Sequence, residues 1–142
     1  MSDGRPPVGL LDTSTVILLP RLRDPGQLPE HPLISAITLA ELSVGPLVAD
    51  DPRERAARQA HLQQAETDFD PLPFDAHAAR AFGRVAASLR AAGRKPAARA
   101  YDALIASIAI ASDMPLYTVN PDNFTAITEL RVVTVPHPDH VN

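Results

Sequence analysis

The stretch "VGLLDTSTVILL", from Val8 to Leu19, places one acid, Asp12, inside an apolar run. The residues Val8 to Leu11 indicate a buried strand, and the apolar residues resume at Val16. A buried carboxylate without a partner is costly, so the charge of Asp12 needs a group that binds it. The stretch therefore predicts a strand of the core and, directly after it, a polar site.

The composition limits the classes of protein to which the chain can belong. Its 142 residues are typical of one domain, and we expect a single domain over residues 1–142, with a core from about 8 to 135 between two short loose ends. The chain has no cysteine, which excludes disulfides and thiolate chemistry. Its apolar runs are far shorter than the roughly 18 residues of a membrane span, so we expect a cytoplasmic protein without a membrane partner.

Apolar runs bounded by turn residues alternate with helical patterns. The apolar runs predict strands at Val8–Leu11, Leu33–Ala36, Pro71–Phe74, Leu116–Val119 and Val132–Val135. The helical patterns cover residues 39–48, 53–68, 76–92 and 96–112, and the third has Asp75 as its N-cap and Gly93 as its stop. This alternation predicts an α/β fold, in which a parallel sheet of four to five strands is covered on both faces.

Polar side chains follow the predicted strands at their carboxyl ends, where open α/β sheets bind ligands. Asp12 comes directly after the first strand. Asn120 follows "LYTV" in the same way, and Asp122 stands two residues further on. Glu41 lies a few residues beyond "LISA", in the first turn of the predicted helix. We therefore expect these side chains to meet at one edge of the sheet.

Asp102 is an acid on a predicted helix that packs on the sheet. In "YDALIASIAIA" it shares a face with Ile105, Ala106 and Ala109, at spacings of three, four and seven residues. An acid on this apolar stripe points toward the sheet and so toward the other acids. Crowded carboxylates repel each other unless a cation joins them, and Mg²⁺ or Mn²⁺ prefers carboxylate and water oxygens. We therefore expect a site for a divalent metal ion.

Each acid also has a purely structural interpretation. Glu41 stands three residues after Thr38, and "TLAE" fits a capping box. Asp12, or alternatively Ser14, could cap a short helix over "STVILL", and Asp102 could pair with an arginine such as Arg99. The joint placement of three separate acids at one predicted edge favours a shared site over three independent structural roles.

A stretch without acids carries the candidate phosphate contacts. The net charge of the chain is −4, yet no Asp or Glu occurs between Ala76 and Tyr101. The cations of this stretch are Arg80, Arg84, Arg90, Arg94, Lys95 and Arg99. Two interpretations carry equal weight, because a basic stretch either binds phosphates or forms a solvated helix face.

Four motifs in this order resemble those of a known family. They are "LLDTS" (Leu10–Ser14), "TLAEL" (Thr38–Leu42), "DALIASIA" (Asp102–Ala109) and "LYTVNPDNF" (Leu116–Phe124). Together they resemble the PIN-domain ribonucleases, and the chain length and the "TLAEL" and "NPDNF" wording are similar to the VapC toxins of bacterial toxin–antitoxin pairs. The resemblance covers nearly the whole chain, from Val8 to Val135.

The resemblance implies a three-layer α/β/α fold and Mg²⁺-dependent endonucleolytic cleavage of structured cellular RNA. By this cleavage a toxin inhibits translation and growth, and Mn²⁺ is expected to substitute for Mg²⁺. It implies Asp12, Glu41 and Asp102 as the catalytic acids, with Asp12 and Asp102 holding the metal ion and Ser14 supporting its shell. It also implies a small VapB-like antitoxin, which blocks the site and anchors the complex to operator DNA. We further expect a homodimer.

The chain departs from the family's pattern at the last motif. Relatives usually keep an acid at the position of Asn120 or at that of Asn123, and both are amides here. Asp122 is adjacent and is a candidate to replace the missing acid, so Asn120 and Asp122 are the supporting candidates. An amide oxygen carries no charge, so a second metal ion should bind weakly if at all.

The resemblance completes a mechanistic hypothesis and leaves two competitors. Glu41 would bind the ion directly or through water, and the cations that contact the RNA phosphates would be Arg80, Arg84, Arg94, Lys95 and Arg99. The first competitor is a phosphoacceptor or phosphatase with Asp12 as nucleophile, which usually needs a second acid where Ser14 stands. The other is a non-catalytic module that binds a small protein.

Overall fold

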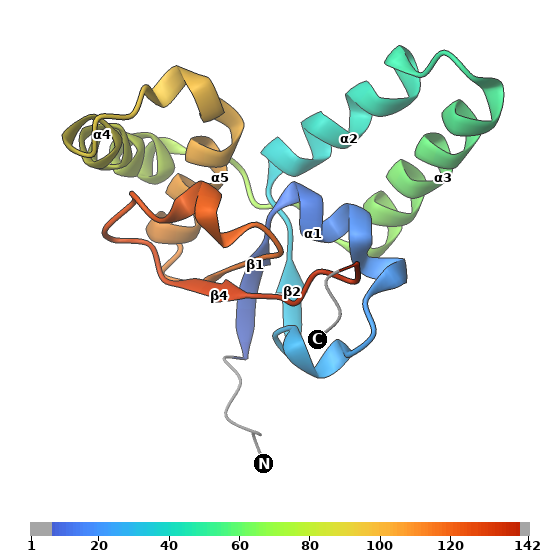
Figure 1. Cartoon of the computed structure of the whole chain (residues 1–142), viewed down its shortest axis with the longest axis horizontal. Helices are drawn as coiled ribbons and strands as arrows, with labels where there is room; N and C mark the ends of the chain where they lie inside the picture. The colour runs from blue at the N-terminus through green and yellow to red at the C-terminus, as the bar shows by residue number, and fades with distance from the viewer. Residues whose placement is uncertain (1–6, 140–142) are drawn as a thin grey trace.

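A parallel four-stranded sheet, in the order β2-β1-β3-β4, forms the centre of the computed structural model, which describes residues 7–139 (Figure 1). Its strands are β1 (Val8–Leu11), β2 (His31–Leu33), β3 (Leu116–Thr118) and β4 (Val132–Thr134). In the central pair Leu10 lies beside Leu116, and Leu11 beside Tyr117. Because the two strands are parallel, the next residues, Asp12 and Thr118, meet at their carboxyl ends.

Within residues 7–139, five α-helices and four 3₁₀ turns accompany the strands. The helices are α1 (Thr13–Leu18), α2 (Ala36–Val48), α3 (Pro52–Asp68), α4 (Ala76–Ala91) and α5 (Ala100–Ala111). The 3₁₀ turns are η1 (Leu19–Arg21), η2 (Pro25–Gln27), η3 (Pro96–Arg99) and η4 (Pro121–Phe124). Each of the first four α-helices begins at an N-cap whose side chain accepts a hydrogen bond from a backbone N–H. These N-caps are Asp12, Ser35, Asp51 and Asp75. No helix within residues 7–139 is long and apolar enough to cross a membrane.

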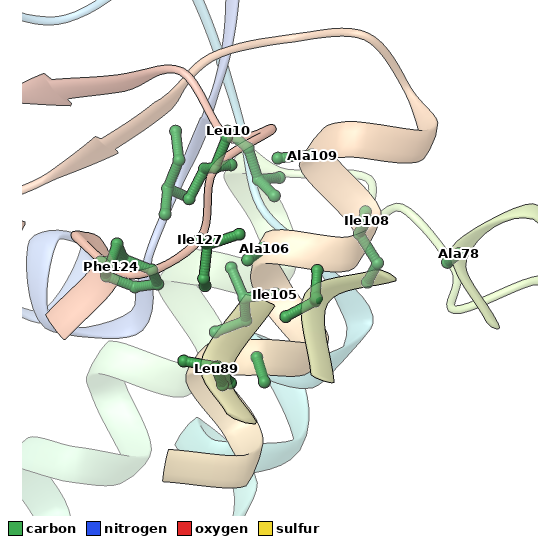
Figure 2. Close-up of a cluster of buried hydrophobic side chains, with 13 residues drawn as sticks. Leu10, Ala78, Leu89, Ile105, Ala106, Ile108, Ala109, Phe124 and Ile127 are labelled. Carbon is green, nitrogen blue, oxygen red and sulfur yellow. The ribbon is translucent and has the colours of Figure 1, made fainter. Parts of the chain in front are cut away.

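The sheet separates two apolar cores, because successive residues of a strand point to opposite faces. Leu10 and Leu116 belong to the first core, which lies under α4 and α5 and is drawn in Figure 2. Leu11 and Tyr117 belong to the second core, together with residues of α1, α2 and α3. Figure 1 shows α4 and α5 to the left of the sheet and α1, α2 and α3 to its right. The expected α/β/α arrangement around a parallel sheet is confirmed.

β1 and β3 fit closely because β1 contains Gly9. A Cβ atom at this position would lie 2.5 Å from the ring of Tyr117 on β3, closer than any real side chain approaches. The absent side chain lets the buried Tyr117 ring cover β1.

The site lies at the point where the direction of the chain across the sheet reverses. β1 leads outward to β2 on one side, while β3 and β4 lie on its other side. A crevice forms at the carboxyl ends of such neighbouring strands, and it is the usual ligand site of an open α/β sheet. Asp12 ends β1 at this switch point.

Two predicted strands were wrong in extent. Over residues 71–74 only Leu72 pairs, as a single bridge to Ser35, because Pro71 and Pro73 on either side have no N–H to donate. The strand predicted at Leu33–Ala36 is β2, but it ends at Leu33. Ser35 instead caps α2, accepting a bond from the N–H of Thr38 at 3.1 Å.

The predicted helix over residues 96–112 is also divided. Pro96 opens the 3₁₀ turn η3, and α5 begins only at Ala100, because Arg99 has the non-helical dihedrals φ −136° and ψ 55°. The preceding helix α4 follows the prediction, with Asp75 as its N-cap and Gly93 at a positive φ of 75° just after its end.

The expected core ends as predicted at Val135, which is buried. In the segment after it, Asp139 forms an ion pair with Arg21 of η1. The remaining residues of the expected loose ends, 1–6 and 140–142, lie outside the described residues.

Candidate active site

Asp12 lies where β1 ends and α1 begins, and its residue is only 2% exposed. Its Oδ1 accepts hydrogen bonds from the Thr15 N–H at 3.1 Å and the Thr15 hydroxyl at 2.5 Å. Its Oδ2 accepts from the hydroxyls of Thr118 at 2.6 Å and Ser14 at 3.2 Å. Four donors fill the roughly four acceptor positions of a carboxylate. These protein donors supply the binding groups that the buried charge of Asp12 needs, while the expectation of a divalent cation beside it stays a prediction.

The hydroxyl groups around Asp12 also join the ends of β1 and β3. The Thr15 hydroxyl accepts a bond from the Val119 N–H at 3.1 Å, and the Thr118 hydroxyl accepts one from the Asn120 N–H at 2.9 Å. Apart from Ser14, sequence reasoning missed these groups. Thr15 had a signal, because it stands three residues after a capping acid, whereas the contact of Thr118 depends on which strand lies beside β1.

Glu41 faces α1 from the second turn of α2. The Thr13 hydroxyl donates to its Oε1 at 2.6 Å and lies 3.0 Å from the Thr38 hydroxyl. Burial raises the pKa of Glu41 above its ordinary value, the Thr13 bond opposes this shift, and the negative charge of Asp12 adds to it.

The capping-box interpretation of Glu41 is wrong. The N-cap of α2 is Ser35, so Thr38 is already the third residue of the helix and Glu41 the sixth. At that position the side chain of Glu41 cannot reach the free N–H groups of the first turn. The expectation that Glu41 lies in the first turn of the helix is wrong as well.

Asp102 stands in the first turn of α5, with a side chain that is 26% exposed. Burial raises its pKa to about 6, and the charges of Asp12 and Glu41 contribute to the same shift. Arg99 opposes it, with its Nη1 4.0 Å from Oδ2 of Asp102. The structure thus brings the three acids into one electrostatic group, and the alternative pairing of Asp102 with Arg99 is present at the same time.

The donor chemistry of this group fits a hard divalent cation. Three carboxylates share one region, Asp102 is hard to ionise there, and such groups are stabilised by an ion of opposite charge. As the side chains stand, no set of three or more His, Cys, Asp or Glu within residues 7–139 is arranged to hold a metal ion. The residues fit the ion by their chemistry, and the side chains would have to turn to surround it.

Two hollows meet at Asp102 and Arg99. One, of about 270 Å³, is also lined by Leu89, Arg94, Lys95, Ala103, Asn123 and Ile127. The other, of about 490 Å³, is also lined by Glu41, Ala97, Ala100 and Tyr101. Asp102 is therefore reached from both hollows and Glu41 from one, and Arg99 lines both.

The structure divides the cations of the basic stretch into two groups. Arg94, Lys95 and Arg99 line the pocket that contains Asp102. Arg80 and Arg84 lie on α4 and are engaged elsewhere: Arg80 Nη2 lies 3.0 Å from His77 Nδ1, and Arg84 Nε donates to Glu129 at 2.7 Å. Arg80 and Arg84 are absent from the lining of either hollow at the acids.

The amides and the acid of the last motif take different positions. The Asn120 amide donates to the Ser14 hydroxyl at 2.9 Å, one bond away from Asp12. Asp122 is exposed on η4, and Asn123 rather than Asp122 lines the pocket with Asp102. The candidate replacement for the missing acid therefore lies away from the pocket, and the polar group that faces it is an amide.

The fold and the site together define an α/β/α domain with an acidic group at the switch point of a parallel sheet. The chain belongs to the PIN-domain family, whose model matches residues 10–130.

Within this family, the chain is similar to proteins named VapC ribonucleases. The chain is similar to Ribonuclease VapC5 of Mycobacterium tuberculosis, with 36% identity over 86% of this chain and 89% of the relative. It is also similar to Ribonuclease VapC8 of the same species, with 37% identity over 77% of this chain and 96% of the relative. A solved structure of VapBC-5 from Mycobacterium tuberculosis, a member of the VapBC family of toxin–antitoxin systems, superposes with a TM-score of 0.79 at 32% identity, over 92% of this chain and all of that one.

Proposed function

We propose that this protein is a metal-dependent endoribonuclease and the toxin of a toxin–antitoxin pair. The observation that carries the proposal is the convergence of Asp12, Glu41 and Asp102, where burial and mutual repulsion raise the pKa of Asp102 to about 6. Relatives named ribonucleases and a structural neighbour from a toxin–antitoxin system support it.

In the proposed mechanism the chain brings its acids to one end of the sheet, where their side chains turn toward the scissile phosphate and the ion. Asp12 and Asp102 would hold Mg²⁺, or Mn²⁺ in its place, and Ser14, whose hydroxyl donates to Oδ2 of Asp12 at 3.2 Å, would support this pair of ligands. The bound ion would polarise the phosphate and lower the pKa of the attacking water. Glu41, which is held by Thr13 and has a raised pKa, would be the carboxylate that accepts a proton.

The cations around the pocket would neutralise the phosphates on either side of the cleavage site. Arg94, Lys95 and Arg99 are exposed and line the pocket beside Asp102. Single-stranded RNA binds such groups with a strong dependence on salt.

The structure argues against one of the two competing functions and leaves the other to experiment. A phosphoacceptor needs an accessible oxygen on Asp12, but both oxygens are buried and each accepts two hydrogen bonds, which argues against a nucleophilic role. A non-catalytic module is favoured only by the amides Asn120 and Asn123, and it predicts no cleavage of any RNA.

The proposed partner is a small VapB-like antitoxin that covers the acids and carries the complex to operator DNA. Its support is the neighbouring VapBC-5 structure and the large apolar side chains that α2 and α5 expose, which are Val44, Leu47, Val48 and Tyr101. A cytoplasmic location and a homodimer remain predictions.

The proposal is tested by incubating total cellular RNA with the purified protein, with Mg²⁺, with Mn²⁺ or with a chelator. We expect discrete fragments with either ion and none with the chelator. Asp12→Asn and Asp102→Asn should each abolish the fragments while the circular dichroism spectrum stays folded. Cleavage that survives in either variant, or in the chelator, would overturn the proposal.

A further inference from the structure

The pocket beside Asp102 has the volume and the lining of a site for one small group with polar edges. Its volume of about 270 Å³ is about nine times the volume of a water molecule in the liquid, and a nucleobase has about ten non-hydrogen atoms. A pocket of this size admits one base and excludes a stacked base pair.

The floor of the pocket is apolar. Leu89 of α4, Ala103 of α5 and Ile127 form it, and all three are buried members of the core between the sheet and these helices. Figure 2 shows Leu89 and Ile127 within this cluster. The faces of a nucleobase are apolar, so this floor suits a base rather than a phosphate.

The rim of the pocket is polar and cationic. The guanidinium groups of Arg94 and Arg99 and the amine of Lys95 are exposed, and these cations form no ion pair among residues 7–139 other than the 4.0 Å contact of Arg99 with Asp102. Guanidinium planes stack on bases, and cations of either kind bind the phosphates that flank them.

Asn123 supplies a group that can distinguish one base from another. Its side chain lines the pocket, and its amide makes no hydrogen bond within the described part of the chain. An amide offers a donor and an acceptor side by side, which matches the hydrogen-bonding edge of a base.

From this arrangement we propose that the pocket is a nucleobase subsite, in which Asn123 reads the base of an unpaired nucleotide next to the scissile phosphate. The inference rests on the proposed function and adds to it the class of substrate and a specificity-determining residue. A base inside the pocket lies beside Asp102, so the adjoining phosphate is presented to the acids. Only nucleotides in loops, bulges or single strands can enter, because a base in a helix is stacked and paired.

The first test measures binding without cleavage. The four ribonucleoside 5′-monophosphates, and ribose 5-phosphate as the control without a base, are titrated into metal-free full-length protein while the methyl signals of Leu89, Ala103 and Ile127 are followed by NMR. We expect the nucleotides to shift these signals and the control to leave them in place. The preferred nucleotide should lose about two- to twelvefold in affinity with Asn123→Leu, the equivalent of one hydrogen bond, and nothing with the neighbouring Asp122→Asn.

Equal binding of ribose 5-phosphate, or an unchanged order of affinities in Asn123→Leu and in the second variant Asn123→Ala, would overturn the inference. The second test sequences the cleavage sites in a randomised single-stranded RNA. We expect a base preference beside the cut that Asn123→Leu weakens and Asp122→Asn retains. Cleavage that depends on Asp12 but keeps its base preference in Asn123→Leu would refute the subsite alone. Nucleotide binding as described without any RNA cleavage would refute the proposed function and leave the subsite standing.

Discussion

At the scale of single residues, the orientation of Asp12 depends on hydroxyl groups that belong to other segments. The Thr118 hydroxyl donates to Asp12 at 2.6 Å and accepts from the Asn120 N–H, so it connects the acid to the end of β3. We expect Thr118→Val, which keeps the shape and removes both bonds, to lower the free energy of unfolding by about 1.5 to 3 kcal/mol and to reduce cleavage. Urea unfolding and an RNA cleavage assay measure the two effects.

The matched control is Thr67→Val on the outer face of α3. Its hydroxyl is exposed and donates only to the Gln63 carbonyl of the same helix, so its loss should change stability by less than about 0.5 kcal/mol. Equal stability losses in the two variants would mean that the Asp12 network contributes nothing specific.

Glu41 allows a separate residue-scale prediction because its structural role as a cap is excluded. Gln keeps the oxygen that accepts the Thr13 bond but cannot accept a proton, so Glu41→Gln should lower the cleavage rate by about 100- to 10,000-fold with little change in melting temperature.

The Thr13 bond lowers the pKa of Glu41, so Thr13→Val should raise that pKa and move the acidic limb of the pH–rate profile to higher pH. An unchanged profile in Thr13→Val would argue that another group accepts the proton.

At the scale of elements, the junction from α4 through η3 to α5 separates the cations that face the acids from those that do not. Changing Arg94, Lys95 and Arg99 together to Ala should weaken the binding of unrelated RNAs alike and reduce the slope of log affinity against log salt by about 2, since each phosphate contact of a single strand contributes about 0.7. Filter binding at several salt concentrations, with cleavage suppressed by a chelator, measures this slope.

The double variant Arg80→Ala and Arg84→Ala is the control for the same experiment. Both residues lie on α4, and Arg84 already pairs with Glu129, so we expect its slope to match that of the unchanged protein. If the slope of log affinity against log salt falls more in the double variant than in the triple variant, the RNA lies along the outer face of α4 instead.

The elements also show what sequence reasoning can reach. β1 and the cap of α4 were predicted correctly because their signals are local: an apolar run ending in an acid, and an Asp before a helical period. For α1 the sequence left Asp12 and Ser14 as alternative caps, and the cap is Asp12. The apolar run "LISA" continues across Ser35 and therefore hides its role as a cap. The apolar segment at Leu72 resembles a strand, but its flanking prolines limit it to a single bridge. The grouping of the acids could be predicted from the position of strand ends, whereas the Thr118 contact required the order of strands in the sheet.

At the scale of the whole molecule, the stability of the fold depends on pH through Asp102. Its pKa is about 6 in the folded chain and near 3.8 without these surroundings. Below about pH 4 the group is protonated in both states and has no effect. Between about pH 4 and 6 the unfolded chain releases this proton first, so the free energy of unfolding falls as pH rises, and above about pH 6 the loss is constant. A raised pKa of an acid therefore destabilises the folded protein at neutral pH, by at most about 3 kcal/mol here.

Neutralising Asp102 should remove this cost, and a bound cation should remove it as well. We expect metal-free Asp102→Asn to melt about 3 to 9 °C above the unchanged protein at pH 7.5 and at the same temperature at pH 4, while the exposed Asp122→Asn changes neither value. Mn²⁺ at 100 times its dissociation constant should stabilise the unchanged protein by about 2.7 kcal/mol, and Asp102→Asn by much less, because one charged ligand is gone. Differential scanning fluorimetry across pH and Mn²⁺ concentration measures both effects. If the three proteins melt alike at pH 7.5 and respond alike to Mn²⁺, then Asp102 neither carries a strained charge nor binds the ion, and the site must be built without it.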